Sequence, residues 1–405
     1  MSTDPAGTPP RYPMPRPAGC PFAPPEELLR RSREEPVFPV SLWSGRSPWL
    51  VTRYQDVRTV LSDTRFSVHR DLPGFPASSL GQVLRDRIAP TFVGMDDPEH
   101  ARHRRMLIAE FGVRRIAALR PVVEETVAHL LDEMAARTGP VDLMEALAIP
   151  LPSMMICRIL GVPYQDHEFI DKHLRIRLDI HSDADTVTRS SNEVEAYFVE
   201  LIRAREHEPT DDLLGRLARD RVRTGELSRQ QAAWTAALLL VAGHATTAHM
   251  IGLGTMVLLA DPARAALLRD GDESQVATAV EELLRVLTVT HTGRRRVAKV
   301  DMELGGVRIR AGEGVIGAAE LANRDPDQFP DPQTIDLART PNHHLALGFG
   351  IHQCIGASLA RLELQVAYPA LLRRFPGLGL AVPAGDIEVV DASVVLASPE
   401  IPVTW

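Results

Sequence analysis

Cysteine is scarce in this chain. Only three occur in 405 residues, Cys20, Cys157 and Cys354, and no two of them form a C-x-x-C pair. The sequence therefore excludes a disulfide framework and a zinc site built from four thiolates. A reducing, intracellular compartment fits this cysteine usage best.

An excess of positive charge is also missing. The net charge is −8 and the sequence pI is about 6.0, so the chain as a whole does not attract nucleic acid or an anionic membrane. Hydrophobic residues make up 44% and charged residues 24%, the balance of a globular protein with a sizeable core.

The sequence shows neither a recognisable secretory signal nor an uninterrupted apolar segment of membrane-spanning length. Residues 1–25 contain nine prolines, and we expect a loose N-terminal arm there. Residues 230–260 lack Asp, Glu, Lys and Arg over a length that could cross a membrane, but glycine, histidine and threonine interrupt the run. The sequence favours a long helix buried in a cytoplasmic, monomeric protein without nucleic-acid or membrane contacts.

Helical periodicity dominates the chain. An apolar stripe runs from Val122 to Met134. Further helices are expected over Glu193–Glu206, Gln230–Leu259, Ser274–Leu287 and Ala357–Leu372. Short strands are expected at Trp49–Thr52, Val300–Leu304 and Val307–Ile309, and an irregular loop at 321–341. We predict a mainly α fold with a smaller β-rich region, in one domain spanning residues 26–405.

One glycine motif resembles a dinucleotide-binding loop but lacks its sequence context. Gly312, Gly314 and Gly317 form a G-x-G-x-x-G sequence after a short strand. A dinucleotide-binding fold needs this loop within successive βαβ units, which the flanking sequence does not supply. We therefore expect no dinucleotide site here.

The richest chemistry lies in residues 347–356, Leu-Gly-Phe-Gly-Ile-His-Gln-Cys-Ile-Gly. Cys354 precedes an expected helix, whose N-terminal amides stabilise negative charge, and glycines on both sides let the backbone approach the sulfur. This favours a thiolate, which could act as a nucleophile or as a single axial metal ligand. A buried, inert cysteine is the alternative.

This segment resembles the signature F-G-x-G-x-H-x-C-x-G of the cytochrome P-450 family, with Leu347 in place of the family's Phe. The likeness extends over almost the whole chain after the arm, in the soluble bacterial form. It implies the P-450 fold, with haem b between the central long helix and the cysteine loop and with Cys354 as the proximal iron ligand. The loop residues implied to surround the cofactor are Gly348, Phe349, Gly350 and Gly356.

A second motif, residues 242–247, resembles the family's oxygen-binding groove, usually A-G-x-E-T-T or A-G-x-D-T-T. The likeness implies a catalytic role for Thr246 beside Thr247, with Ala242 and Gly243 leaving room for oxygen. The alternative is a Thr246 hydroxyl bonded back to the carbonyl one turn earlier. Ala245 replaces the family's acid, so the usual carboxylate of the proton relay is missing.

Two further sets of charged residues match the family. Glu282 and Arg285 form its structural E-x-x-R pair. Thr334 stands where the family's loop arginine falls, so the third partner is missing by strict alignment, with Arg339 as a candidate substitute. The cations matching those that hold the haem propionates are His100, Arg104, Arg296 and His352. The basic cluster comprising Arg102, Arg104, Arg105, Arg114 and Arg115 is either a solvated surface or a docking patch for an acidic electron donor.

The resemblance implies a haem-thiolate monooxygenase that uses O2 and electrons from NAD(P)H, delivered by a ferredoxin reductase and a ferredoxin. We expect hydroxylation or epoxidation of a bulky apolar natural product, such as a polyketide, macrolide or terpenoid. The expected substrate pocket draws on the loop 71–91, a lid at 169–187, and Leu238, Val241, Ala242, Val289 and Thr290.

Two alternatives remain at this point. The chain could run atypical P-450 chemistry, such as peroxide-driven oxidation, coupling or rearrangement, because residue 245 is alanine. It could also be a non-catalytic haem or ligand-binding protein.

Overall fold

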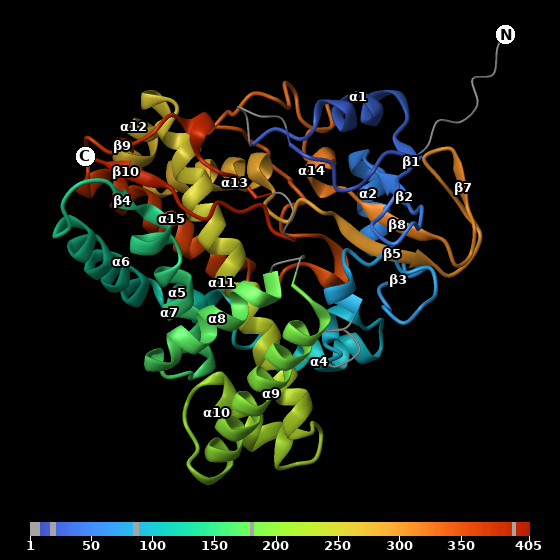
Figure 1. Ribbon diagram of the computed structural model, residues 1–405, viewed down its shortest axis with the longest axis horizontal. Helices are drawn as coiled ribbons and strands as arrows, with labels where there is room; N and C mark the ends of the chain where they lie inside the picture. Colours follow the sequence, from blue (N-terminus) through green and yellow to red (C-terminus); the bar gives the residue numbers. More distant parts are fainter. Residues whose placement is uncertain (1–8, 17–21, 84–88, 179–181, 391–393) are drawn as a thin grey trace.

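A computed structural model describes residues 9–16, 22–83, 89–178, 182–390 and 394–405. Helices fill most of the molecule, and the main sheet lies towards one end of it (Figure 1). The predicted mainly α architecture with a smaller β-rich region is confirmed.

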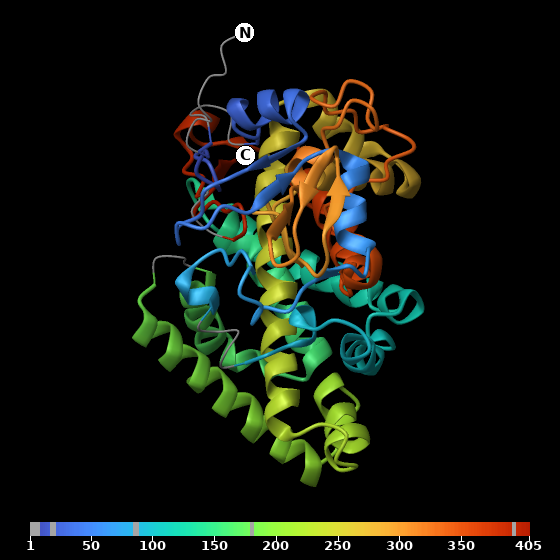
Figure 2. The same cartoon turned by 90° about the vertical axis from the view of Figure 1, so that its right-hand side faces the viewer.

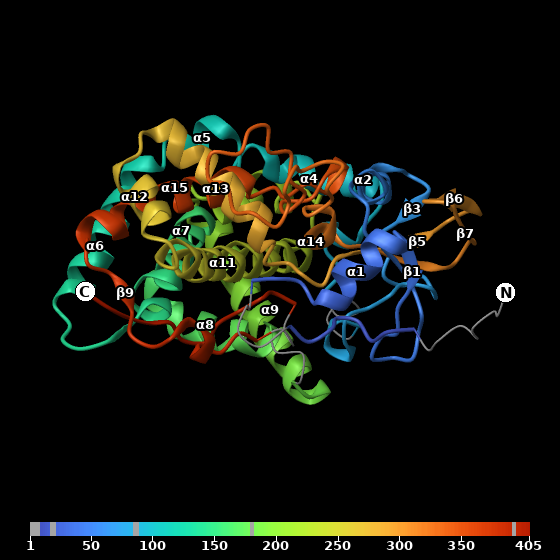
Figure 3. The same cartoon turned by 90° about the horizontal axis from the view of Figure 1, so that it is seen from above.

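The central element is helix α11, Arg229–Leu259, which crosses the molecule (Figure 2). A capping box between Ser228 and Gln231 fixes its start. Its length and composition would suit a membrane span, but 67% of its most apolar window is buried inside the protein. Helices α7, Pro150–Leu160, α9, Ala184–His207, and α15, Ala357–Arg374, pack along it (Figure 3). The prediction of a buried central helix is confirmed.

Small residues let the other helices approach α11 closely. A Cβ placed on Gly254 would lie 1.9 Å from the hydroxyl oxygen of Tyr368 on α15, and that hydroxyl donates a hydrogen bond to the carbonyl of Met250. Because a side chain at 254 would drive α15 away, glycine at this position fixes the spacing between α11 and the helix that follows Cys354.

The other predicted helices also form, with small changes at their ends. They are α6, Arg120–Ala135, and α13, Glu273–Leu287. Helix α9 begins nine residues before the predicted start, because Asp183 caps it by accepting a hydrogen bond from the Thr186 amide. Further helices are α1 Glu26–Glu34, α2 Tyr54–Ser62, α4 Glu99–Ile108, α5 Val113–Ala117, α8 His167–Leu178, α10 Leu213–Leu217, α12 Pro262–Asp270 and α14 Ala319–Ala322.

The main sheet has the strand order β1-β2-β8-β5-β3. Only β2 and β8 run parallel to each other. Its strands are β1 Val37–Pro39, β2 Trp49–Val51, β3 Phe66–Ser67, β5 Arg294–Ala298 and β8 Gly314–Gly317. The predicted pair near residues 300–309 forms a hairpin of β6, Met302–Leu304, and β7, Val307–Ile309. A third sheet joins β4 Val141–Asp142, β10 Pro402–Thr404 and β9 Gly379–Leu380.

The glycine motif does not form a nucleotide-binding loop. Gly314 and Gly317 lie at the two ends of strand β8, and Gly312 forms the turn before it at φ +86°. Only the four-residue helix α14 follows. The expectation of no dinucleotide fold at this motif agrees with this geometry.

Part of the N-terminal arm is held firmly against the β-rich region. The Tyr12 amide donates to the Ser41 carbonyl at 2.9 Å, and the Tyr12 hydroxyl donates to the His291 carbonyl at 3.1 Å. Tyr12 is buried beside Phe38 and Ile316, and Arg16 pairs with Glu320 on α14. The expectation of a loose arm is therefore wrong for residues 9–16, while residues 1–8 and 17–21 lie outside the described chain.

Candidate active site

A cavity of about 470 Å³ lies between α11, β5 and the loop that carries Cys354. Its size is within the usual range for a small-molecule site. Residues predicted for quite different roles meet in its lining, namely Arg104, Leu238, Val241, Ala242, Ala245, Thr246, Thr247, Val289, Thr290, Arg296, Gly348, Phe349, His352 and Cys354. The fold thus brings the two main sequence motifs to one space.

The loop before Cys354 takes its shape from glycines in the left-handed region. Gly348 has φ +77° and Gly350 has φ +72°, and a Cβ at Gly350 would lie 2.8 Å from the Leu61 carbonyl oxygen. The Cys354 amide donates to the Leu347 carbonyl at 2.8 Å. The Gly356 amide hydrogen-bonds the sulfur. This backbone presents an accessible Cys354 side chain to the cavity at the start of α15.

Enclosure in the cavity shapes the acidity of Cys354 in the absence of a metal ion. Although the side chain is accessible from the cavity, desolvation by the surrounding protein raises the pKa of the Cys354 thiol, and this outweighs the opposite effects of the Gly356 amide and the guanidiniums of Arg294 and Arg104. A coordinating metal ion deprotonates a thiol outright, so this thiol suits a metal ligand better than a free nucleophile.

The α11 wall of the cavity carries the second motif. The Thr246 hydroxyl donates to the Ala242 carbonyl at 2.9 Å, which is the back-bonded geometry weighed from the sequence. The Thr246 oxygen keeps acceptor capacity towards the cavity. A Cβ at Gly243 would lie 3.0 Å from Ile156 on α7, so the room that Gly243 leaves is on the α7 side.

Four cationic or basic side chains gather from three elements. His100 and Arg104 come from α4, Arg296 from β5, and His352 from the cysteine loop. The rings of His100 and His352 lie 4.1 Å apart between centroids. Burial, followed by the charges of His100 and Arg296, lowers the pKa of His352 to about 3, and burial lowers that of Arg296 to about 10.

Of these four side chains only His100 has an anionic partner among the described residues, with its Nδ1 3.2 Å from Asp97 Oδ1. The Nε2 atoms of His100 and His352 are buried without a hydrogen-bond partner there. Arg104 donates to the Gln353 carbonyl at 2.7 Å and Arg296 to the Arg295 carbonyl at 2.9 Å, both backbone groups. Buried donors of this kind fit the two carboxylates of a haem, with Cys354 available to its iron.

Comparisons with known proteins agree with this fit. Residues 276–402 match the family model described as "Cytochrome P450". The chain is 44% identical to "Cytochrome P450-SU2" of Streptomyces griseolus over 97% of this chain and 96% of the relative. The chain belongs to the cytochrome P450 family.

Solved structures show the same likeness. The crystal structure of GfsF, a cytochrome P450 of Streptomyces halstedii, is 42% identical and superposes with a TM-score of 0.92 over 98% of this chain and 100% of that one. A structure of CYP105P1 in complex with filipin I is 39% identical, with a TM-score of 0.90 over 98% and 99% of the two chains.

Membership of the cytochrome P450 family makes this protein a monooxygenase, an oxidoreductase. It implies a haem iron, O2 and electrons from NAD(P)H delivered by partner proteins. The predicted enzyme class is thus confirmed over a non-catalytic binding protein. The Streptomyces relatives also support a place in secondary-metabolite biosynthesis.

The substrate side of the P450 cavity is only partly as predicted. Leu238, Val241, Val289 and Thr290 line it. From the predicted loop 71–91, Phe75 and Gln82 line the cavity, and residues 84–88 lie outside the described chain. Phe92, just beyond the predicted loop, also lines it. The described lid residues Ile170, His173, Ile176 and Val187 line a separate, smaller cavity between α8, α9 and α11, and residues 179–181 are not described.

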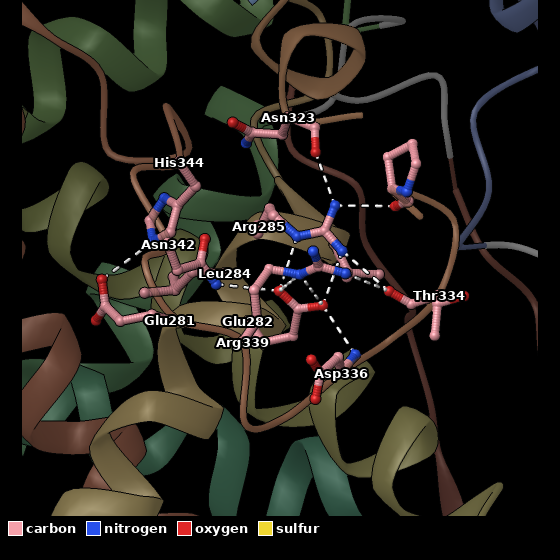
Figure 4. A network of polar contacts seen from close by, with 12 residues as sticks. Glu281, Glu282, Leu284, Arg285, Asn323, Thr334, Asp336, Arg339, Asn342 and His344 are labelled. Atoms are coloured by element: carbon pink, nitrogen blue, oxygen red, sulfur yellow. Dashed lines mark hydrogen bonds and ion pairs between the residues drawn. The ribbon is translucent and has the colours of Figure 1, made fainter. Parts of the chain in front are cut away.

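The E-x-x-R pair is fully buried and centres a polar network (Figure 4). Arg285 donates from Nε and Nη2 to the two carboxylate oxygens of Glu282, each at 2.7 Å. The same guanidinium donates to the carbonyls of Asn323, Pro332 and Thr334. Arg285 therefore ties α13 to the loop that leads to Cys354.

Arg339 occupies the third place in this network. Its Nε donates to Glu282 at 3.2 Å, and the Asn342 amide adds a bond to the same carboxylate at 3.0 Å. Burial raises the pKa of Glu282, but the bonds and charge of Arg285 outweigh it, so the pKa is lowered. Thr334 contributes its backbone carbonyl rather than its side chain.

A neighbouring clamp was not predicted from the sequence. Glu281 accepts two hydrogen bonds from Arg361 on α15, each at 2.7 Å, and contacts His344 Nε2 at 3.1 Å. These bonds outweigh the effect of burial and lower the pKa of Glu281 to about 2. Adjacent glutamates on α13 therefore hold the two segments on either side of Cys354.

A buried acid behind the α11 motif was also missed. Glu363 on α15 is 1% exposed, and both its carboxylate oxygens lack a hydrogen bond of normal geometry within the described chain. Burial raises its pKa to about 8, and the Thr247 hydroxyl, the polar group facing it, opposes this only weakly. Glu363 is therefore mostly protonated at neutral pH. The available sequence signal was the position of Glu363 on α15, the helix that follows Cys354.

We expect the three loop-anchoring residues to differ sharply in their effects on stability. Arg285→Ala leaves the Glu282 carboxylate buried without its main counter-charge and should cost about 3–5 kcal/mol. Arg339→Ala should cost less, about 1–3 kcal/mol, because Glu282 keeps Arg285. Urea unfolding of each variant measures these differences. Thr334→Ala is the matched control and should be near neutral, because only its carbonyl is used; equal losses in all three would contradict the network.

The buried acid predicts a pH-dependent difference in stability. Because the folded-state pKa of Glu363 is about 8 against an ordinary value of 4.5, the folded protein holds a proton that the unfolded chain loses between these values. Its contribution is therefore full below pH 4.5 and falls as the pH rises towards 8, by up to about 1.4 kcal/mol per pH unit. Glu363→Gln should remove this loss.

Thermal midpoints at pH 5.5 and 8 check the Glu363 prediction. Glu363→Gln should gain on the wild type as the pH rises. Glu125→Gln, an exposed acid on α6, should run parallel to the wild type. A parallel course for Glu363→Gln would show that Glu363 is ionised in the folded protein.

Proposed function

We propose that this P450 holds haem b between α11 and the Cys354 loop and inserts oxygen into a bulky, mainly apolar secondary metabolite. The observation that carries this proposal is the cavity that Cys354, three residues of α11 and three basic side chains line together, namely Ala242, Ala245, Thr246, Arg104, Arg296 and His352. When bound, a haem supplies reductive activation of O2, leading to hydroxylation or epoxidation of the substrate.

Different residues of this chain bind the iron, bind the propionates and shape the loop around that cofactor. Cys354 Sγ is the iron ligand, and the Gly356 amide fixes the sulfur and stabilises its negative charge. His100, Arg104, Arg296 and His352 bind the propionates. Gly348, Phe349 and Gly350 form the loop that keeps the sulfur open to the cavity, and Glu282 with Arg285 secures the loop's approach.

Proton supply needs a route without an acid at Ala245. The Thr246 hydroxyl must turn from the Ala242 carbonyl before it can donate into the cavity. Glu363 holds a proton near neutral pH on the far side of Thr247. We propose that Thr246 and Thr247 orient water, with a polar group of the substrate completing the relay in place of the missing carboxylate.

Apolar side chains favour a large apolar substrate. Leu238, Val241 and Val289 line the cavity with Phe75 and Val395. The CYP105P1 structure is named for its complex with filipin I, and GfsF and other relatives come from Streptomyces. A polyketide, macrolide or terpenoid substrate is the proposal that fits these observations.

The surface beside the cysteine loop is the proposed docking site for a ferredoxin, itself reduced by a ferredoxin reductase with NAD(P)H. Of the basic cluster, Arg104 turns inward, whereas Arg102, Arg105, Arg114 and Arg115 are exposed. Exposed Ile108 and Val113 lie among them. Positive charge around apolar contacts suits an acidic electron donor. We propose a cytoplasmic monomer that meets this partner transiently.

The second candidate is atypical P450 chemistry at the same site. Ala245 favours it, because peroxide-driven oxidation brings its own protons to the reaction. Product formation with peroxide and without a reductase would distinguish it from the reductive reaction.

The thiolate assignment has a spectroscopic test. The purified protein should contain haem, and its reduced carbon monoxide complex should show the strongly red-shifted Soret band of thiolate ligation. Cys354→Ala should abolish this band. Cys157→Ala, a substitution at the other described cysteine in helix α7, should keep it. An unchanged band in Cys354→Ala would remove Cys354 as the iron ligand and the proposal with it.

Removal of the propionate cations should weaken haem retention. Arg296→Ala and Arg104→Ala each leave a carboxylate short of a charge-assisted hydrogen bond worth about 1.5–3 kcal/mol. Haem content after gel filtration measures the effect. Arg223→Ala, on an exposed turn, is the control and should retain haem like the wild type. The cation assignment is overturned if all three variants keep the same amount.

A further inference from the structure

The cavity is lined by more positive charge than a haem can use. Five arginines line it, and no aspartate or glutamate is among its described lining residues. The five are Arg70, Arg104, Arg294, Arg295 and Arg296. A haem brings two carboxylates, for which Arg104 and Arg296 are already placed with two histidines. Positive charge therefore remains for another anion.

Strand β5 separates its three arginines onto two sides. Successive side chains of a strand point to opposite faces, so Arg294 and Arg296 share a face and Arg295 lies on the other. The electrostatic partners agree with this alternation. Arg294 interacts with Cys354, and Arg296 with His352, whereas Arg295 interacts with Tyr12; Arg70 influences both Arg295 and Arg296. Arg295 is therefore directed away from the Cys354 side.

The guanidinium of Arg295 is poorly satisfied. Its Nη1 makes two long bonds, to Thr292 Oγ1 at 3.3 Å and to the Gly293 carbonyl at 3.4 Å. Its Nε and Nη2 are buried and have no hydrogen-bond partner among the described residues. Burial lowers the pKa of Arg295 to about 10, so the group stays charged at neutral pH. A buried cation whose acceptors are few and neutral is costly unless an anion joins it.

Arg295 lines the cavity together with Thr292 and Gly293. Tyr12, from the N-terminal segment, lies next to Gly293, where its hydroxyl oxygen would be 3.4 Å from a Cβ, but it is not itself a lining residue. Arg70, the nearby cation, lines the cavity and lies against Gly94. The apolar residues Leu238, Val241 and Val289 line the same space. The cavity thus combines an apolar body with a cationic end.

We propose that Arg295 binds an anionic oxygen group of the substrate, a carboxylate in the simplest case, and thereby selects amphipathic acids. This inference rests on the proposed function, because it places the substrate in the same cavity. A guanidinium binds a carboxylate through two parallel hydrogen bonds, and Arg295 has two unused donor atoms. The bound acid would orient the apolar part of the molecule along α11. Arg295 is therefore a specificity-determining residue.

Binding of a matched pair of probes tests this role. Lauric acid and methyl laurate share an apolar chain and differ in charge. Isothermal titration calorimetry at pH 8 on the haem-loaded protein, together with the substrate-induced spectral shift, should show laurate binding about tenfold or more tightly than the ester. Arg295→Ala should abolish this preference and leave ester binding within about twofold of the wild type.

Two further variants sharpen the experiment. Arg295→Lys should keep part of the preference, because a point charge attracts a carboxylate without the bidentate geometry. Arg223→Ala should match the wild type. Equal weakening of both probes by Arg295→Ala would show a packing role and overturn the proposal. So would loss of haem comparable to that in Arg296→Ala, or equal binding of acid and ester by the wild type.

The carbon monoxide spectrum of the same preparations separates this inference from the proposed function. A thiolate-type spectrum with no preference for the acid overturns the role of Arg295 alone. A wild-type protein without the thiolate spectrum overturns the proposed function, whichever probe binds better.

Discussion

The buried pair of Glu282 and Arg285 is the constraint on which the site depends. Both side chains are fully inaccessible to solvent, and together they bond to backbone groups or side chains of residues 323–342. This stretch has little regular structure of its own, so its path to Cys354 follows from these bonds rather than from helix or strand pairing. Glu281 extends the same control to α15 through Arg361. A single helix, α13, thereby positions both the segment that precedes Cys354 and the helix that follows it.

Much of this arrangement could be predicted from the sequence, because its local signals are strong. Helical periodicity located α6, α11, α13 and α15 to within a few residues. The glycines around Cys354 identified the loop, and three-residue spacing identified Glu282 with Arg285. These features depend on neighbours in sequence or on short motifs. The sequence left open whether Arg339 replaces the missing loop arginine, and only the fold brings Arg339 to Glu282.

What escaped prediction depends on contacts between distant segments. Strand β5 was missed because three successive arginines show no alternation of polar and apolar residues. Its strand conformation depends on pairing with the flanking strands β8 and β3. Tyr12 is ordered by Ser41 and His291, far along the chain, so a proline-rich composition gave the wrong expectation for residues 9–16. The desolvation that raises the pKa of Cys354 was missed, because burial cannot be read from a helix start. Glu363 needed the packing of α15 on α11 to become visible.

The alternation of strand β5 has an evolutionary consequence. Pairing with β8 places Arg296 on one face of the strand and Arg295 on the other. Under the two proposals, in which Arg296 binds a propionate and Arg295 binds the substrate anion, a substitution at 295 would change which molecules the cavity admits and leave Arg296 in place. An insertion of one residue in the strand would exchange the two faces and disturb both contacts. A lineage could then change its metabolite by point mutation at 295 but not by a change in the length of this strand.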